Sequence, residues 1–199
     1  VSRENNTGFC RVPKDIYVAR AALHMWEEPP VSGTRGSGTV FFAGCNLGCV
    51  FCQNKKISRS PSGRIYTEDE LCDVMLHLES EGAHNVNLVT PTHYTESIVR
   101  VLEKVKPMLR VPVVWNSGGY ESVETLRALE GLVDVYLPDL KYFSPELSER
   151  YSSAPDYFEV AGAAIAEMYR QTGSAVFKTE EIDGTSVELI KRGVIVRHL

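Results

Sequence analysis

Apolar residues along this chain follow two alternating patterns: short runs that are mostly apolar, and longer segments in which every third or fourth residue is apolar. The short runs lie at residues 39–42, 86–89, 111–115 and 133–137, and the final stretch, 194–198, begins in the same way. Mostly apolar runs of four or five residues are typical of strands that are buried on both faces. The longer segments have the period of amphipathic helices. The pattern therefore predicts strands that alternate with helices.

The first predicted helix has a clear start and a clear end. Thr67 and Glu70 have the spacing of a capping box, in which each side chain bonds the backbone N–H of the other residue. Gly82 follows the segment as a C-terminal glycine. The residues with helical spacing between these ends, which should face the core, are Leu71, Val74, Met75 and Leu78.

Four more helices are predicted after the later strands. The first two carry their apolar faces at Ile98, Val101, Leu102 and Val105, and at Val123, Leu126 and Leu129. The next begins with Ser144 as the cap and Pro145 at the first helical position. The last opens with a second capping box, Asp156 with Glu159, and ends at Gly173.

Alternating strands and helices indicate parallel βαβ units in an α/β fold. Right-handed crossovers then place the helices on the outside of a curled sheet. Because functional groups of parallel α/β folds collect at the carboxyl ends of the strands, the polar segments that follow these strands should converge there. These segments are Cys45–Cys52, Thr90–His93, Asn116–Gly119, Asp139–Lys141 and Arg197–His198.

The size and charge of the chain restrict its class. With 199 residues, 43% of them hydrophobic and 24% charged, it fits a single globular domain. A net charge of −5 argues against a protein that mainly binds nucleic acid, and Lys55–Lys56 is interpreted as solvated surface. No apolar run reaches the length of a membrane span. Residues 1–8 carry no signal-peptide pattern and the cysteine count of five is odd, which favours a reducing, cytoplasmic location.

The strongest chemical feature is a run of three cysteines directly after the first predicted strand. Cys45, Cys49 and Cys52 have C-x3-C-x2-C spacing, with the aromatic residue Phe51 before the last cysteine. A fully protein-ligated [4Fe–4S] cluster takes four thiolates. Three thiolates on one loop therefore leave one iron open to a small molecule. An open iron indicates chemistry rather than electron storage alone.

A structural zinc site is the alternative for the same loop. Zinc sites commonly take four Cys or His ligands. This loop offers three, so a fourth would come from elsewhere, for example Cys10 or His24. The aromatic residue before the last cysteine and the βα pattern that follows favour the iron–sulfur interpretation.

The cysteine run resembles the signature of the radical S-adenosylmethionine (SAM) superfamily. The longer stretch from Ala21 to Gln53 is similar to the branch described as pyruvate formate-lyase activating enzyme-like proteins, and it reads AALHMWEEPPVSGTRGSGTVFFAGCNLGCVFCQ. The likeness continues through residues 90–93, 115–119, 139–141 and 197–198.

The resemblance implies that SAM chelates the open iron of a [4Fe–4S] cluster and that one electron splits SAM into methionine and a 5′-deoxyadenosyl radical. It also implies a partial (β/α)6 barrel. Residues 1–38 would form an N-terminal extension with a glycine-rich lead-in, and residues 39–199 the radical SAM core. Since the family's barrel has at least one more strand, we expect a fragment truncated after the fifth strand. Cys10 would be the last cysteine of an upstream cysteine-rich segment, or an inert thiol.

The resemblance also implies contacts to SAM. Phe51 is expected to lie against the adenine. The turn from Thr90 to His93 replaces the Gly-Gly-Glu run of many radical SAM enzymes, so the SAM amino group should meet backbone carbonyls, Thr92 or His93. Alternatively, the segment is only the cap of the next helix. Asn116 and Ser117 suit the ribose or the SAM carboxylate, with a plain glycine turn as the alternative.

The last two strands add charged candidates. Asp139 and Lys141 should point to one face of a strand and orient SAM, unless they form a surface ion pair. Arg197 is expected to bind the SAM carboxylate. Its neighbour His198 should then point to the opposite face.

These features predict an enzyme that takes one electron from an external donor of the flavodoxin or ferredoxin type. It would cleave SAM and abstract hydrogen from a glycyl-radical protein or from a small molecule. The alternative is a non-catalytic module that holds zinc or an iron–sulfur cluster, or an inactive fragment. In the run of His24, Glu27, Glu28 and Pro29, helical spacing would bring the histidine near a glutamate and allow a His/Glu metal pair. The run is interpreted instead as a packed structural segment and is assigned no catalytic role.

Overall fold

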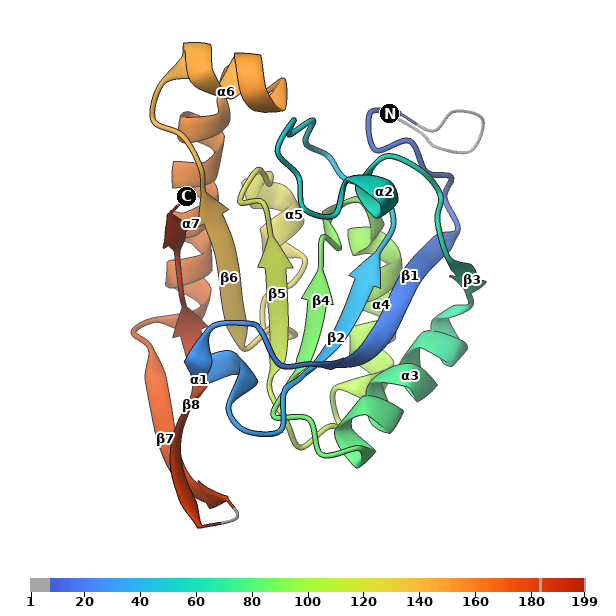
Figure 1. Cartoon of the computed structure of the whole chain (residues 1–199), viewed down its shortest axis with the longest axis vertical. Helices are drawn as coiled ribbons and strands as arrows, with labels where there is room; N and C mark the ends of the chain where they lie inside the picture. Colours follow the sequence, from blue (N-terminus) through green and yellow to red (C-terminus); the bar gives the residue numbers. More distant parts are fainter. Residues whose placement is uncertain (1–7, 183, 199) are drawn as a thin grey trace.

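The computed structural model describes residues 8–182 and 184–198, and the described strands join in one sheet. Its strand order is β3-β1-β2-β4-β5-β6-β8-β7, with β9 paired to β6 (Figure 1). The strands are β1 (Ile16–His24), β2 (Ser37–Phe42), β3 (Arg64–Tyr66), β4 (Val86–Val89), β5 (Val113–Ser117), β6 (Val135–Leu140), β7 (Val176–Ile182), β8 (Thr185–Val194) and β9 (Arg197–His198).

The centre of the sheet is parallel, as the alternation of strands and helices predicts. β2, β4, β5 and β6 pair in parallel, and the next position is shared by the end of β8 and by β9. The arrowheads of the central strands point to the same edge in Figure 1, so their carboxyl ends meet there. The expectation of an α/β fold with a parallel sheet is confirmed, and the arrangement is compatible with a partial barrel.

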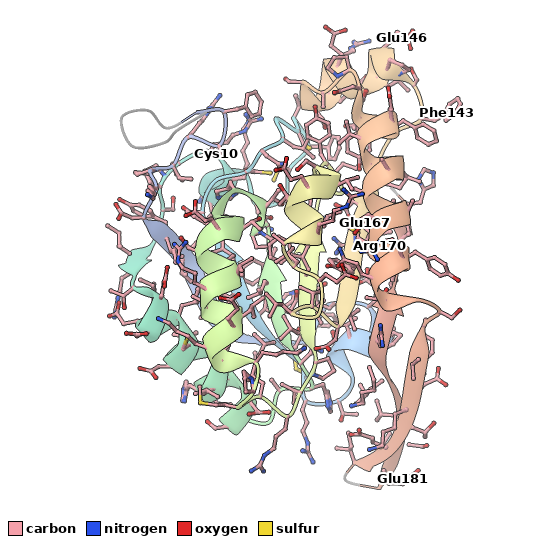
Figure 2. All side chains as sticks on the ribbon, turned by 180° about the vertical axis from the view of Figure 1, so that it is seen from behind. Cys10, Phe143, Glu146, Glu167, Arg170 and Glu181 are labelled. Atoms are coloured by element: carbon pink, nitrogen blue, oxygen red, sulfur yellow. The ribbon has the colours of Figure 1, made fainter. Side chains whose placement is uncertain are left out.

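The two faces of the sheet are covered differently. The described helices are α1 (Pro29–Ser32), α2 (Lys55–Ser58), α3 (Glu68–Ser80), the 3₁₀ turn η1 (Thr92–Tyr94), α4 (Thr95–Val105), α5 (Val123–Arg127), α6 (Pro145–Ser152) and α7 (Tyr157–Thr172). Of these, α3, α4, α5 and α7 cover one face, which Figure 2 shows from the front. The opposite face is crossed by the segment from β1 to β2, which includes α1 (Figure 1).

The described residues form three hydrophobic clusters, and two of them lie on the two faces of the sheet. The larger lies between the sheet and the helices and contains Trp115 and Tyr136. The four predicted apolar residues of α4 are all buried in it. Each such side chain contributes roughly 1.5–3 kcal/mol when it leaves water. A smaller cluster on the other face joins Val31 of α1 to Val114 and Leu137, so α1 closes part of the inner face.

Most helix boundaries agree with the sequence analysis. The capping box of α3 is present, with Thr67 Oγ1 accepting from the Glu70 N–H at 3.2 Å and Glu70 Oε2 accepting from the Thr67 N–H at 2.9 Å. Ser144 caps α6 ahead of Pro145. The second capping box is wrong, because Asp156 makes no capping bond. Its carboxylate accepts a hydrogen bond from the Tyr120 hydroxyl at 2.6 Å instead.

The strands outside the parallel centre were not predicted. β1 pairs antiparallel with β2, and β3 pairs antiparallel with β1 at the edge of the sheet. The polar stretch before residue 194 forms the antiparallel pair β7 and β8. The described part of β7 is mostly exposed, so its polar side chains carry no apolar pattern to reveal it. The expected helical spacing around His24 is also wrong, because His24 ends strand β1.

None of the described helices is long and apolar enough to cross a membrane.

Candidate active site

The cysteine loop leaves the carboxyl end of β2, at the edge where the parallel strands end (Figure 1). Backbone hydrogen bonds hold it at both sides. Gly44 N–H donates to the Ile57 carbonyl at 2.8 Å, and Gly48 N–H donates to the Ser152 carbonyl at 2.9 Å. Gly44 has φ of +85°, and a Cβ there would lie 2.7 Å from the Cys10 carbonyl oxygen. A glycine is therefore required where the chain enters the loop.

The three predicted metal ligands are free thiols in this loop. Cys49 is buried in the third hydrophobic cluster, with Leu47 and Tyr157, and Cys45 and Cys52 are partly buried and pack against that cluster. The Leu47 N–H donates to Cys45 Sγ at 3.4 Å, and Ser152 Oγ donates to Cys49 Sγ at 2.9 Å. Burial raises the pKa of Cys45 to about 11. This thiol is therefore neutral near pH 7 and must lose its proton when it binds a metal.

The candidate donor set on this loop consists of three thiols. In the part of the chain that the structure describes, no group of three or more His, Cys, Asp or Glu side chains is arranged to hold one metal ion. A cubane cluster does not require that arrangement, because each thiolate binds a different iron. Thiolates are also the ligands that iron–sulfur clusters prefer. Three free thiols on one loop are the number and type of ligand that a [4Fe–4S] cluster with one open iron takes.

The turn after β5 packs directly against the cysteine loop. A Cβ at Gly118 would lie 2.8 Å from a methyl carbon of Leu47. Asn46 Nδ2 donates to the Tyr120 carbonyl at 2.5 Å. The loop and the ends of the parallel strands therefore form one continuous surface.

Four of the predicted SAM contacts come together at this edge. Arg197 Nε lies 2.8 Å from Asp139 Oδ1, and Arg197 Nη2 donates to Asn116 Oδ1 at 2.7 Å. Lys141 Nζ pairs with the other carboxylate oxygen of Asp139. Because the side chains of Lys141 and Asp139 are only 10% and 14% exposed, the surface ion pair considered above is wrong. His198 is exposed and bonds the Leu140 carbonyl, so only Arg197 faces inward, as predicted.

Glu27 belongs to this group, and the sequence analysis assigned it no role. Asn116 Nδ2 donates to Glu27 Oε1 at 3.2 Å, and Arg197 Nη1 lies 3.7 Å from Glu27 Oε2. Glu28 approaches the same guanidinium, at 3.9 Å from Nε. Burial raises the pKa of Glu27, and Arg197 opposes that shift. Pairs of acidic residues are common on surfaces, so the Glu27–Glu28 run alone gave no signal for this contact.

Thr92 and His93 lie at the end of β4, but their polar side chains are used inside the protein. His93 Nε2 donates to the Ala43 carbonyl at 2.7 Å, since a carbonyl oxygen only accepts. Thr92 Oγ1 donates to Glu121 Oε1 at 2.6 Å. His93 therefore supports the entrance of the cysteine loop, and the SAM amino contact expected from these side chains stays a prediction.

The side chains of Ser117 and its neighbour Asn116 lie on opposite faces of the sheet. Consecutive strand residues point to opposite faces. Ser117 Oγ accepts from the Gly119 N–H at 3.2 Å on the helix side, where it also lowers the pKa of Glu121. Of these two residues, only Asn116 joins the group formed by Arg197, Asp139 and Lys141. Ser117, which was also predicted to contact SAM, lies on the other face of the sheet, away from that group.

Two buried residues at this edge were missed by the sequence analysis. Glu121 Oε1 accepts from Thr92 and from Trp115 Nε1, at 2.8 Å for the latter, and burial raises its pKa. The Tyr157 hydroxyl lies 2.8 Å from both the Gly118 and the Asp139 carbonyl oxygens. Both act between elements that are distant in sequence, which no local pattern reveals.

The predicted adenine contact remains accessible. Phe51 is 49% exposed, and its ring lies edge-on to that of Tyr142 at 6.3 Å between centroids. Cys10 is buried, with Sγ 3.9 Å from the Val12 carbonyl oxygen, and Figure 2 labels it at the same end of the molecule as the cysteine loop.

Comparison with known proteins gives three findings. Residues 39–179 match the family model of the radical SAM superfamily. Uncharacterized protein MJ0674 of Methanocaldococcus jannaschii is 39% identical over 169 residues, which cover 80% of this chain and 48% of that protein. The 7-carboxy-7-deazaguanine synthase of Methanothermobacter thermautotrophicus is 37% identical over 68 residues, covering 33% of this chain and 27% of the synthase. The chain thus spans about half the length, or less, of these relatives.

The family match covers most of the chain and begins in the strand that delivers the cysteine loop. Proteins of this superfamily generally bind a [4Fe–4S] cluster and SAM. The three free thiols and the polar group at the carboxyl edge suit those two cofactors. This chain belongs to the radical SAM superfamily.

Proposed function

We propose that this radical SAM enzyme binds its cluster through Cys45, Cys49 and Cys52 and binds SAM at the adjoining carboxyl edge of the sheet. The cluster and SAM, when bound, supply a 5′-deoxyadenosyl radical that abstracts a hydrogen atom from a substrate. The observation that carries the proposal is the position of three free thiols beside the polar ends of β5, β6 and β9. The sequence itself places no fourth cysteine in the loop.

The side chains at this edge would orient SAM and exclude water. Phe51 offers an exposed aromatic ring for the adenine. Lys141 supplies a largely buried ammonium group, held by Asp139, that can meet the SAM carboxylate. Arg197 already donates a hydrogen bond to Asn116 and forms an ion pair with Asp139, so its main role would be to hold these two side chains in place. Thr92 and His93 would contribute through backbone carbonyls near the SAM amino group.

The first test is reconstitution with iron and sulfide under anaerobic conditions. The wild-type protein should become brown, bleach with dithionite and release 5′-deoxyadenosine from SAM. Serine substitution of any one loop cysteine should abolish product formation and reduce the bound iron. Cys72→Ser is the matched control, because Cys72 is a buried thiol on α3 that bonds the Val101 carbonyl. A colourless protein that holds one zinc ion would support the non-catalytic module instead.

We further propose that the hydrogen donor is a backbone glycine of a glycyl-radical protein. The supporting observation is the likeness of residues 21–53 to activating enzymes of such proteins. Incubation of the reconstituted enzyme with SAM and pyruvate formate-lyase should produce a glycyl radical, measured by electron paramagnetic resonance. The short match to 7-carboxy-7-deazaguanine synthase favours a small-molecule substrate as the second candidate. SAM cleavage without a glycyl radical would favour that second candidate.

A further inference from the structure

A positively charged depression lies next to the cysteine loop. It has a volume of about 1020 Å³, and its lining residues are Arg11, Gln53, Asn54, Lys55, Lys56, Ile57 and Arg59. Four of these residues are cationic and none is acidic. We call this surface the basic depression. The surrounding sequence also lacks acidic residues, because none occurs between Glu28 and Glu68.

The charges of the basic depression are available to a partner. Lys55 and Lys56 are exposed, and they form no ion pair with any residue that the structure describes. The whole chain carries a net charge of −5. A local cluster of cations on an acidic protein creates a positive potential that attracts negatively charged surfaces and steers their approach.

The basic depression is connected to the cysteine loop by short contacts. The Arg59 guanidinium donates to the Gly48 carbonyl. Ser58 Oγ lies 3.5 Å from Cys52 Sγ. Figure 1 shows α2 directly beside the loop that follows β2. Only a few bonded and hydrogen-bonded atoms would therefore separate a partner bound here from Cys52.

We propose that the basic depression is the docking site of an acidic one-electron carrier protein. The inference rests on the proposed function, which requires one external electron for each SAM molecule cleaved. The carrier loses one electron and the cluster gains it, and no covalent bond forms or breaks between the two proteins. Surface carboxylates of the carrier would pair with Lys55, Lys56 and Arg11. Nucleic acid fits less well, because its binders need many phosphate contacts and a strongly basic surface.

The test compares a protein donor with a small-molecule donor. Lys55→Glu/Lys56→Glu reverses two charges of the basic depression. Arg110→Glu/Lys178→Glu is the matched control, because it changes the net charge equally at exposed positions on other parts of the molecule. SAM cleavage by the reconstituted enzymes is measured with dithionite and with reduced flavodoxin. The rate with dithionite should be the same in all three proteins.

With flavodoxin, kcat/KM of the Lys55/Lys56 variant should fall about tenfold or more, while the control keeps at least half of the wild-type value. The wild-type rate should fall steeply with added salt, and that of the variant should change little. Equal losses in the variant and the control would overturn the proposal. So would an unchanged flavodoxin rate in the variant.

A binding measurement separates this proposal from the proposed function. Calorimetric titration of the metal-free proteins with flavodoxin should give a dissociation constant at least tenfold weaker for the Lys55/Lys56 variant than for the control. If dithionite gives no 5′-deoxyadenosine with the wild-type protein, the proposed function fails, and the titration still decides the docking site. Binding of duplex DNA in place of flavodoxin, lost in the same variant, would overturn the proposal.

Discussion

Removal of the Tyr157 hydroxyl should separate the two strand ends that carry the candidate SAM contacts. Tyr157 is fully buried at the start of α7. Its hydroxyl lies 2.8 Å from the Gly118 and Asp139 carbonyl oxygens and accepts from the Lys141 N–H at 3.1 Å. One side chain therefore joins the turn after β5 to the end of β6.

The expected cost of Tyr157→Phe follows from these contacts. The substitution keeps the ring and deletes about two net hydrogen bonds, since one hydroxyl proton is shared between two carbonyls. At roughly 0.5–1.5 kcal/mol for each bond, with a further cost for groups left unsatisfied, the free energy of unfolding should fall by about 2–3 kcal/mol. For a chain of this size the unfolding midpoint should drop by about 4–12 °C.

Urea and thermal unfolding of the metal-free protein measure this effect without any cofactor. Tyr169→Phe is the matched control, because Tyr169 lies on the same helix, is exposed, and has its hydroxyl 3.4 Å from Ser174 Oγ. Its effect should stay within about 0.5 kcal/mol. A Tyr157→Phe protein as stable as the control would refute the reasoning, because it would mean that the three backbone groups are satisfied without the hydroxyl.

Two further predictions concern buried charge. Burial raises the pKa of Glu121 above its ordinary value of 4.5, so the folded state holds this proton more tightly than the unfolded state. The stability that this proton contributes is complete below about pH 4.5 and is lost as the pH rises through the folded-state pKa of Glu121. Urea unfolding between pH 4 and 8 should therefore show a decline in the free energy of unfolding for the wild type that Glu121→Gln lacks. Equal pH dependence of the two proteins would contradict this prediction. Arg197→Gln should lower the free energy of unfolding by about 2–4 kcal/mol, because it removes the guanidinium from the buried carboxylate of Glu27, whereas Asp139 keeps Lys141. Arg197→Gln/Glu27→Gln should recover part of that loss in the same unfolding assay.

The central strands were predictable because their environment is uniform. A strand covered by helices on one face and by the crossing segment on the other needs apolar residues at nearly every position, and β4 has the bounds that its apolar run predicts. The helix starts were predictable for a different reason. Thr67 with Glu70, and Ser144 with Pro145, satisfy backbone groups within one turn, so the signal is local.

The outer strands lacked such a signal. β1 carries the charged residue Arg20 between apolar residues and pairs at the antiparallel side of the sheet. The described residues of β7 are mostly exposed, and those of β8 mix exposed, partly buried and buried positions without a regular alternation, while the two strands pair along their length. The apolar pattern does not reveal backbone pairing of this kind, because any polar side chain can face water from either strand.

The candidate site shows the same division between local and distant information. The cysteine spacing and the polar residues at the strand ends were predictable, since topology alone brings the carboxyl ends of parallel strands together. Glu27 was not, because its partner Asn116 is 89 residues away and the contact depends on the path of the segment between β1 and β2.

The position of Glu27 also changes the interpretation of Arg197. From the sequence, Arg197 was expected to bind the SAM carboxylate. In the structure, its guanidinium lies near three carboxylates, those of Glu27, Glu28 and Asp139. A guanidinium in that setting neutralises the protein's own charges before it can neutralise a ligand. Lys141, whose described contacts involve one carboxylate, is then the better donor to an incoming carboxylate. The sequence alone could not show that Lys141 is the better donor, because the contact of Glu27 with Arg197 depends on how the segment between β1 and β2 crosses the sheet.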